Sequence, residues 1–355
     1  MQPIITVSGT PREQGRQQGE ALKDSIAQAI LSVKEKLADS KVDPEFYKGY
    51  IARNAAFLER NHPNQIQEIQ GIAEGSGLPY EDLLTLNIPA YFLTEYFNQE
   101  CSMLLVRAPA SIDGNTYLIK NRDMGTHIEQ CVLHRKLPQG DIIEVNGVGT
   151  VTYPASGINS HGLGVTTTGF WSDLVKPNLE EIDCTHIFVN IRVLLEQCKP
   201  VDEVLECLKT YPRMNGLNII AADATQAVVI ETTRDNMYIQ RDDGSGLLWR
   251  TNHYMLPEIS PFNPPPTKYQ STHKRYARIG EMLEERLAAG KIRFQDMWRI
   301  MSDHQNEINA ICRHPSENIP AHTASTSMVC IEDGEAWTTI GNPCENLRYT
   351  KLSNF

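Results

Sequence analysis

One cysteine stands where the chain can present a nucleophile at a newly formed N-terminus. Cys101 begins a short apolar run that has the pattern of a strand and ends at Val106. A turn signal at 112–115 follows, and a second strand-like run at 116–119 leads into the polar stretch 120–123. The pattern predicts a β-hairpin with a thiol at its first residue. If the chain is cut before Cys101, the freed α-amine, whose pKa is about 7.7–8.0 in small peptides, can serve as the base for the thiol.

Polar groups later in the chain match what such a nucleophile needs. In a hairpin, Asp123 returns toward Cys101 and provides an acceptor for an amine. Asn252 offers an amide donor for an oxyanion, and Arg275 offers a cation that can hold a carboxylate network. The Gly-rich stretch 156–169 offers backbone N–H donors. Each also has a structural reading, because Asp, Asn and Gly are frequent in turns and an Arg near a helix start is often only part of a basic face.

A second arrangement of nucleophile and base stays open at this point. Asp303 and His304 together with Cys101 would form a Cys-His-Asp set like that of papain-type proteases. That class places its cysteine at the start of a helix, whose dipole favours the thiolate. Since the residues after Cys101 have a strand pattern, the N-terminal nucleophile is the favoured interpretation.

The composition is that of a globular protein and argues against several classes. The chain has 355 residues, of which 41% are hydrophobic and 22% are charged. Its formal net charge of -11, without a basic run, argues against a nucleic-acid partner. No stretch approaches the roughly 18 apolar residues of a membrane helix, and the N-terminus lacks the pattern of a signal peptide. We therefore expect a cytoplasmic protein without a membrane partner.

The spacing of cysteine, histidine and glycine predicts neither a metal nor a nucleotide cofactor. The eight cysteines are spread along the chain without a CxxC pair, so they indicate neither a disulfide scaffold nor a zinc motif. The ten histidines include no HExxH pattern. Gly162 and Gly164 lack the third glycine of a dinucleotide fingerprint, and no P-loop pattern is present.

Helical patterns fill most of the first hundred residues. The stretch 10–13 is a capping box with proline at the first helical position, and apolar residues continue at helical spacing to about Leu37. Further helices are predicted at 44–60, 64–74 and 80–96.

From residue 101 onward strand patterns dominate, in two blocks with helices between and after them. Strands are predicted at 102–106, 116–119, 131–135, 142–145, 150–153, 164–168, 217–222, 227–232, 237–241, 327–331 and 336–340, and helices at 184–197, 201–209, 272–289 and 293–304. Consecutive strands are joined by turns rather than by crossover helices. The pattern therefore favours an α+β fold with antiparallel sheets packed by helices.

Taken together, these motifs resemble the isopenicillin N acyltransferase family of N-terminal nucleophile cysteine hydrolases. The matching segments are 8–19, 101 with 120–123, 218–223 with 229–231, 250–253, 271–275, 302–304, 311–314 and 341–344. No single segment is specific, but their order and spacing match over most of the chain.

The resemblance implies an αββα sandwich of two antiparallel sheets, the N-terminal nucleophile hydrolase fold, with a helical pro-segment. It also implies a precursor that cuts itself between Glu100 and Cys101. The products would be an α-chain of residues 1–100 and a catalytic β-chain of residues 101–355.

The resemblance also implies roles for individual residues. By analogy with the related bile salt and penicillin V hydrolases, Cys101 is the nucleophile, Asp123 orients its amine, Asn252 donates to the oxyanion and Arg275 organises the site. The supporting and pocket residues that the matching motifs imply are Lys120, Asn121, Arg122, Asn159, Gly169 and Ser271.

Three positions depart from the family pattern. Glu100 precedes the nucleophile, where processing members often have glycine. Lys120 stands where bile salt hydrolases carry an arginine, and Gly169 stands where they carry an asparagine, so only its backbone can donate. Glu100 keeps a second class open, namely an unprocessed, non-catalytic homologue that binds an N-acyl ligand or a partner.

The implied substrate is a small-molecule N-acyl amide, which would react through an acyl-enzyme. No pattern indicates a coenzyme A site, so the sequence does not decide whether acyl-CoA is an acyl donor. We take hydrolysis as the default reaction because water is always available. The acyl and amine groups of the substrate and a homo-oligomeric state also stay open.

Overall fold

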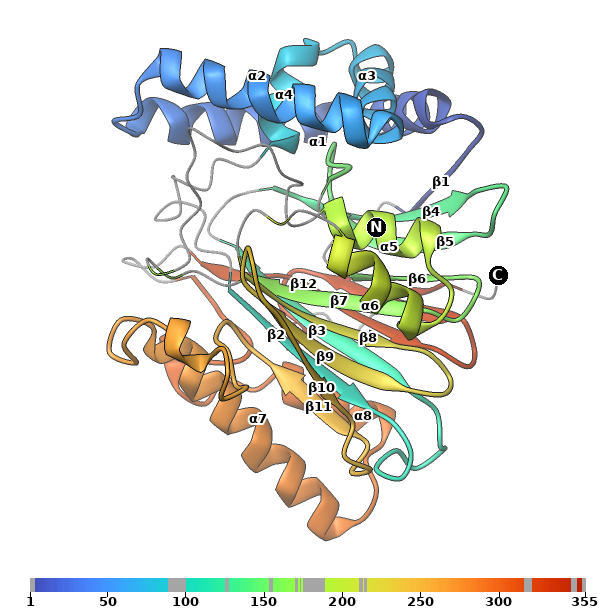
Figure 1. Cartoon of the computed structure of the whole chain (residues 1–355), viewed down its shortest axis with the longest axis vertical. Coiled ribbons are helices and arrows are strands. Elements are labelled where there is room, and N and C mark those ends of the chain that lie inside the picture. The colour runs from blue at the N-terminus through green and yellow to red at the C-terminus, as the bar shows by residue number, and fades with distance from the viewer. Residues whose placement is uncertain are drawn as a thin grey trace.

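The chain folds into two β-sheets that pack against each other and carry helices on their outer sides (Figure 1). This computed structural model describes residues 4–88, 100–124, 128–152, 156–169, 172, 174, 189–210, 213, 216–315, 321–345 and 350–352.

Four helices form a layer at the N-terminal end of the chain, at the top of Figure 1. They are α1 (Pro11–Asp39), α2 (Pro44–Asn61), α3 (Pro63–Ser76) and α4 (Tyr80–Asn87). The first three begin with a proline, whose fixed φ suits the first helical position. The predicted capping box is present, since Thr10 and Glu13 bond reciprocally. The predicted fourth helix at 80–96 ends at Asn87, and residues 89–99 lie outside the described part.

Helices α1 and α3 approach until their backbones touch. A Cβ added at Gly15 on α1 would lie 2.0 Å from the backbone oxygen of Glu68, and one at Gly71 on α3 would lie 2.1 Å from that of Arg12. Real side chains do not tolerate such distances, so only glycine fits at these contacts. The glycines thus fix how closely the two helices pack.

The first sheet has eight strands in the order β1-β4-β5-β6-β7-β8-β9-β10. Their bounds are β1 (Ile4–Ser8), β4 (Gln130–Lys136), β5 (Ile142–Gly147), β6 (Ser156–Asn159), β7 (Gly164–Gly169), β8 (Leu217–Ala222), β9 (Ala227–Thr232) and β10 (Met237–Arg241). All neighbours pair antiparallel except β1 and β4, which are parallel. The sequence did not predict β1.

The second sheet has six strands in the order β11-β2-β3-β12-β13-β14, all antiparallel. Their bounds are β11 (Leu247–Arg250), β2 (Glu100–Val106), β3 (Tyr117–Met124), β12 (His322–Cys330), β13 (Glu335–Ile340) and β14 (Thr350–Leu352). Strands β2 and β3 form the predicted hairpin, and their register places Glu100 opposite Asp123 and Cys101 opposite Arg122.

Three apolar cores separate the layers. The core between the sheets includes Met103 and Leu105 from β2 and Ile220 from β8. The outer face of the first sheet shares a core with the N-terminal helices, α5 (Val189–Gln197) and α6 (Val201–Thr210). The outer face of the second sheet packs on α7 (Gln270–Ala289) and α8 (Phe294–Met301). The predicted α+β fold, an αββα sandwich of antiparallel-rich sheets, is confirmed.

Some predicted elements differ from the structure. The strand prediction at 150–153 is wrong for residues 150–152. The backbone N–H of Thr150 donates to the Gly147 carbonyl in a turn, and the N–H of Val151 donates to the Asn87 side chain, so neither pairs with a strand. The strand begins at Ser156 instead.

Other differences concern the ends of elements. The helix predicted at 293–304 stops at Met301, and the strand predicted at 327–331 already begins at His322. Residues 184–188 of a predicted helix lie outside the described part.

Candidate active site

Cys101 is the second residue of β2, and its side chain faces the layer between the sheets. Side chains alternate along a strand. Met103 and Leu105 lie in the core between the sheets, whereas Leu104 and Val106 lie in the core under α7 and α8, so Cys101 shares the face of Met103. The residue is 5% exposed. The thiol is thus shielded from bulk water.

Asn252 and Arg275 hold the backbone of Cys101 from two other elements. The Cys101 N–H donates to Asn252 Oδ1 at 2.8 Å, and the Arg275 guanidinium donates to the Cys101 carbonyl oxygen. Arg275 also donates to Asn252 Oδ1 at 2.9 Å and is fully buried. These distant residues meet because β11, which precedes Asn252, pairs with β2, and α7 packs on the same sheet.

Glu100, the residue before Cys101, is anchored by three side chains. Its carboxylate forms ion pairs with Arg275 and Arg313, each at 2.7 Å, and accepts a hydrogen bond from the Ser271 hydroxyl. Burial alone would raise the pKa of Glu100, but the charges of the two arginines outweigh it and lower that pKa to about 2. The anchored carboxylate fixes the position of the peptide bond between residues 100 and 101.

Asp123 lies opposite Glu100 in the strand register and is fully buried. Its Oδ1 accepts a hydrogen bond from the Thr323 hydroxyl at 2.8 Å, whereas its Oδ2 has no hydrogen-bond partner among the described residues. Burial raises the pKa of Asp123 to about 6, and the charges of Arg275 and Arg313 limit the rise. A carboxylate with an open acceptor oxygen at this position is suited to bind an ammonium group.

Lys120 shares the inter-sheet face with Cys101. It is buried, and its ammonium donates to the backbone oxygen of Thr167. Burial lowers the pKa of Lys120 to about 8, and the neighbouring Cys101 acts in the opposite direction.

The backbone oxygen of Gly169 accepts a hydrogen bond from Asn252. The Nδ2 of Asn252 donates to the Gly169 carbonyl oxygen at 2.8 Å. An amide nitrogen carries two N–H groups, so this bond orients Asn252 and leaves its second N–H as a candidate oxyanion donor.

Asn121 and Asn159 contact other parts of the fold, whereas Arg122 lies opposite Cys101 in the strand register. Asn121 donates to backbone oxygens of Met301 and Ile311 beside α8. Arg122 donates to the side chain of Gln130 on β4. Asn159 donates to backbone oxygens at the end of α5. Arg122 lies on the same face of β3 as Lys120 and pairs with Cys101 in the strand register, so its contact with Gln130 connects the site with the first sheet.

The papain-type alternative does not match the geometry. Cys101 lies within a strand and not at a helix start. Asp303 pairs with Arg278 at 3.1 Å, and the Nε2 atoms of His304 and His314 are 3.1 Å apart. The contacts of Asp303 and His304 are thus with α7 and with the stretch before β12.

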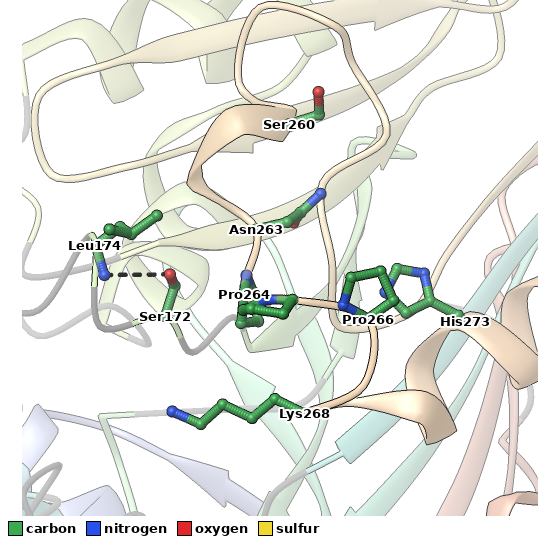
Figure 2. Close-up of a pocket in the computed structure, with 9 residues that line it drawn as sticks. Ser172, Leu174, Ser260, Asn263, Pro264, Pro266, Lys268 and His273 are labelled. Atoms are coloured by element: carbon green, nitrogen blue, oxygen red, sulfur yellow. Dashed lines mark hydrogen bonds between the residues drawn. The ribbon is translucent and has the colours of Figure 1, made fainter.

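A cavity of about 700 Å³ is lined mainly by the proline-rich loop before α7. Figure 2 shows Pro264 and Pro266 between Ser172 and Leu174 on one side and His273 on the other. The lining residues are Ser172, Leu174, Ser260, Asn263, Pro264, Pro265, Pro266, Lys268 and His273.

A short chain of contacts connects the cavity wall with Asn252. The His273 ring contacts the His253 ring in a tilted arrangement with 4.1 Å between centroids, and His253 Nδ1 is 2.9 Å from the Thr272 hydroxyl. That hydroxyl accepts a hydrogen bond from the Asn252 N–H at 2.6 Å. The sequence did not single out these cavity residues or Arg313, although Arg313 lies within the segment 311–314.

The fold and the comparisons define the class of the protein. The chain belongs to the acyl-coenzyme A:6-aminopenicillanic acid acyl-transferase family, whose sequence profile matches residues 111–345. The matched range begins after Cys101 and contains Asp123, Asn252 and Arg275. The chain is therefore an enzyme of an acyltransferase family, and its two packed sheets form the N-terminal nucleophile hydrolase fold.

Two solved structures with low sequence identity share the fold. Two variants of the conjugated bile acid hydrolase from Clostridium perfringens match with TM-scores of 0.52 and 0.53 and 15% identity, over 71% of this chain and 92% of theirs. Penicillin V acylase from Agrobacterium tumefaciens matches with a TM-score of 0.47 and 12% identity, over 71% of this chain and 84% of its own. Within the described residues, no helix is long and apolar enough to cross a membrane.

Proposed function

We propose that the chain is a self-processing amidohydrolase that uses Cys101 as an N-terminal nucleophile on a small N-acyl amide. The proposal is carried by the groups around one peptide bond, between Glu100 and Cys101. Asn252 binds the amide N–H, Arg275 binds the following carbonyl, and Asp123 lies across the strand pair. The family and its fold support the same chemistry.

The first reaction is cleavage of the precursor. Cys101 Sγ attacks the carbonyl carbon of Glu100, the C–N bond breaks, and the thiol proton passes to the released nitrogen, which leaves a thioester. Water then hydrolyses the thioester. Glu100 becomes the C-terminal residue of a 100-residue α-chain, and Cys101 becomes the first residue of a 255-residue β-chain. The anchoring of the Glu100 side chain by Arg275 and Arg313 supports this step, because it fixes the reacting carbonyl.

The second reaction is turnover by the mature enzyme. The new α-amine takes the thiol proton, and the Cys101 sulfur attacks the amide carbonyl of the substrate. The second N–H of Asn252 stabilises the oxyanion. The amine product leaves with the proton from the α-ammonium, and water hydrolyses the acyl-enzyme. The open Oδ2 of Asp123 orients the α-ammonium between these steps.

The cavity in Figure 2 is the proposed substrate pocket. Its volume of about 700 Å³ is in the range of small-molecule sites, and its prolines offer apolar contact to an acyl group. We propose hydrolysis as the reaction because water is always available, with transfer from acyl-CoA as the other outcome within the family.

Release of amine from N-acyl amides tests the function. We expect the wild-type chain and Cys207→Ala, a variant of a half-buried thiol on α6, to release amine from a panel of N-acyl amides of varied chain length. Cys101→Ala should release none. If Cys101→Ala turned over the same amide at the wild-type rate, the mechanism would be wrong. If neither wild type nor control acted on any amide while the chain bound one, the non-catalytic binding class would replace it.

A further inference from the structure

Four potential metal ligands, none of them assigned to catalysis, gather beside the start of β12 and the end of β13. The ligand atoms of His304, Cys312, His314 and Cys344 all lie within 4.8 Å of one another. They come from three segments, namely the residues after α8, the stretch before β12 and the loop after β13. We call these four residues the Cys2His2 cluster. From sequence the set was not predictable, because its spacing matches no zinc motif.

The distances within the Cys2His2 cluster fit one tetrahedral ion. The two Nε2 atoms are 3.1 Å apart, the two sulfurs are 3.6 Å apart, and His314 Nε2 is 3.3 Å from one sulfur and 4.0 Å from the other. Zinc bonds of about 2.3 Å to sulfur and about 2.0–2.1 Å to nitrogen, at tetrahedral angles, separate the ligand atoms by roughly 3.3–3.8 Å. These four of the six separations bracket the tetrahedral values, and the two from His304 to the sulfurs are at most 4.8 Å.

Groups outside the cluster already orient two of its ligands. Glu345 Oε1 lies 3.5 Å from His314 Nδ1, which leaves Nε2 as the nitrogen that faces the cluster. Asn342 Nδ2 donates to Cys312 Sγ at 3.4 Å. Carboxylates on the distal nitrogen of a histidine and N–H donors to a thiolate are the outer contacts that metal sites use. We propose that the Cys2His2 cluster binds one zinc ion.

Four protein ligands close the coordination shell, so the ion is structural rather than catalytic. The zinc ion would lie close in sequence to a residue that contacts Glu100. Arg313 lies between two ligands in sequence, its N–H donates to the Thr323 hydroxyl at 2.9 Å, and its guanidinium pairs with Glu100. Asn342 also donates to the Arg313 carbonyl oxygen. The zinc ion thus holds the backbone on which Arg313 is placed.

Metal analysis of untagged protein tests the proposal without an activity assay. We expect about one zinc per chain by elemental mass spectrometry after dialysis, and a substantial loss of zinc in Cys344→Ser and His304→Ala. Cys207→Ser and His161→Ala, at positions outside the cluster, should keep the wild-type zinc content. Zinc that stays in the two cluster variants would overturn the assignment.

Cobalt substitution of the wild-type chain covers the case in which a cluster variant does not fold. A tetrahedral site with two thiolates should give visible cobalt absorption together with sulfur-to-cobalt charge-transfer bands, and zinc should abolish both. Absence of zinc and of the cobalt bands would refute the site. So would a disulfide between Cys312 and Cys344, seen as a loss of two hydrogens in the mass of a peptide pair.

Discussion

At the scale of residues, two carboxylates and two arginines lie around the peptide bond between Glu100 and Cys101. The positive charges of Arg275 and Arg313 act to lower the pKa values of both Glu100 and Asp123. The negative charge of Glu100 adds to the rise in the pKa of Asp123 that burial causes. If the chain is cut between residues 100 and 101, the new α-ammonium of Cys101 adds a positive charge near Asp123, which favours a charged carboxylate. Maturation should therefore favour the ionised form of Asp123.

Processing should depend on pH through Asp123. Its carboxyl is neutral below about pH 6 and charged above, and only the charged form stabilises the ammonium that forms when the C–N bond breaks. We expect the rate of fragment formation, followed by denaturing electrophoresis, to rise through about pH 6. Glu100→Gln should move this rise to lower pH because a negative neighbour is removed.

Asp123→Asn serves as the control, since it should remove the rise. A wild-type profile that is flat across this range would contradict the assignment of Asp123, as would a Glu100→Gln profile that does not move.

The residue types of the site were predictable, but their contacts were not. Cys101, Asn252 and Arg275 were singled out from motifs and do meet in the structure. The sequence could not show which residues of the run 120–123 contact the site. Their partners on each face of β3 are set by other strands and helices. Arg313 was missed as a partner of Glu100 because only the fold brings the segment before β12 to β2.

At the scale of elements, the contact between α1 and α3 depends on glycine. Gly71→Ala adds a methyl group against the backbone of Arg12, whereas Gly49→Ala on α2 meets only the end of the flexible Arg53 side chain. We expect Gly71→Ala to lower the free energy of unfolding by about 1–3 kcal/mol, measured by urea denaturation. Gly49→Ala should be neutral or stabilising by up to about 1 kcal/mol. Equal effects of the two variants would show that the helix contact is not tight.

Caps and periodicity predicted the helices better than the strands. Proline and Thr10 mark the helix starts by local chemistry, so α1 and α2 were placed to within a few residues. Strands β1 and β11 are only five and four residues long, and their partners are distant in sequence. Local patterns do not carry that information, and the strand predicted at 150–153 failed because side-chain hydrogen bonds satisfied its backbone.

At the scale of the whole molecule, the predicted α-chain and β-chain share one core. Ile26 and Ile69 of the N-terminal helices lie in the same cluster as Leu133 of the first sheet. Glu68 on α3 pairs with Arg135 on β4 at 2.5 Å, and both side chains are buried. Strand β1 also pairs with β4. Cleavage between residues 100 and 101 would break none of these contacts.

The two chains should therefore stay together after processing. We expect both fragments to co-elute in size-exclusion chromatography in native buffer and to separate in denaturant. Glu68→Gln should weaken the association, because loss of one partner from a buried ion pair costs about 3–5 kcal/mol. A 100-residue fragment that elutes alone in native buffer would contradict a shared core.

The most direct measurement is the intact mass of freshly purified wild-type protein beside Cys101→Ala, both incubated near neutral pH. The proposed function predicts two wild-type masses that correspond to residues 1–100 and 101–355, and a single uncut chain of 40.0 kDa for the variant. A wild-type chain that stays uncut, or a Cys101→Ala chain that is cut at the same bond, would contradict Cys101 as an N-terminal nucleophile.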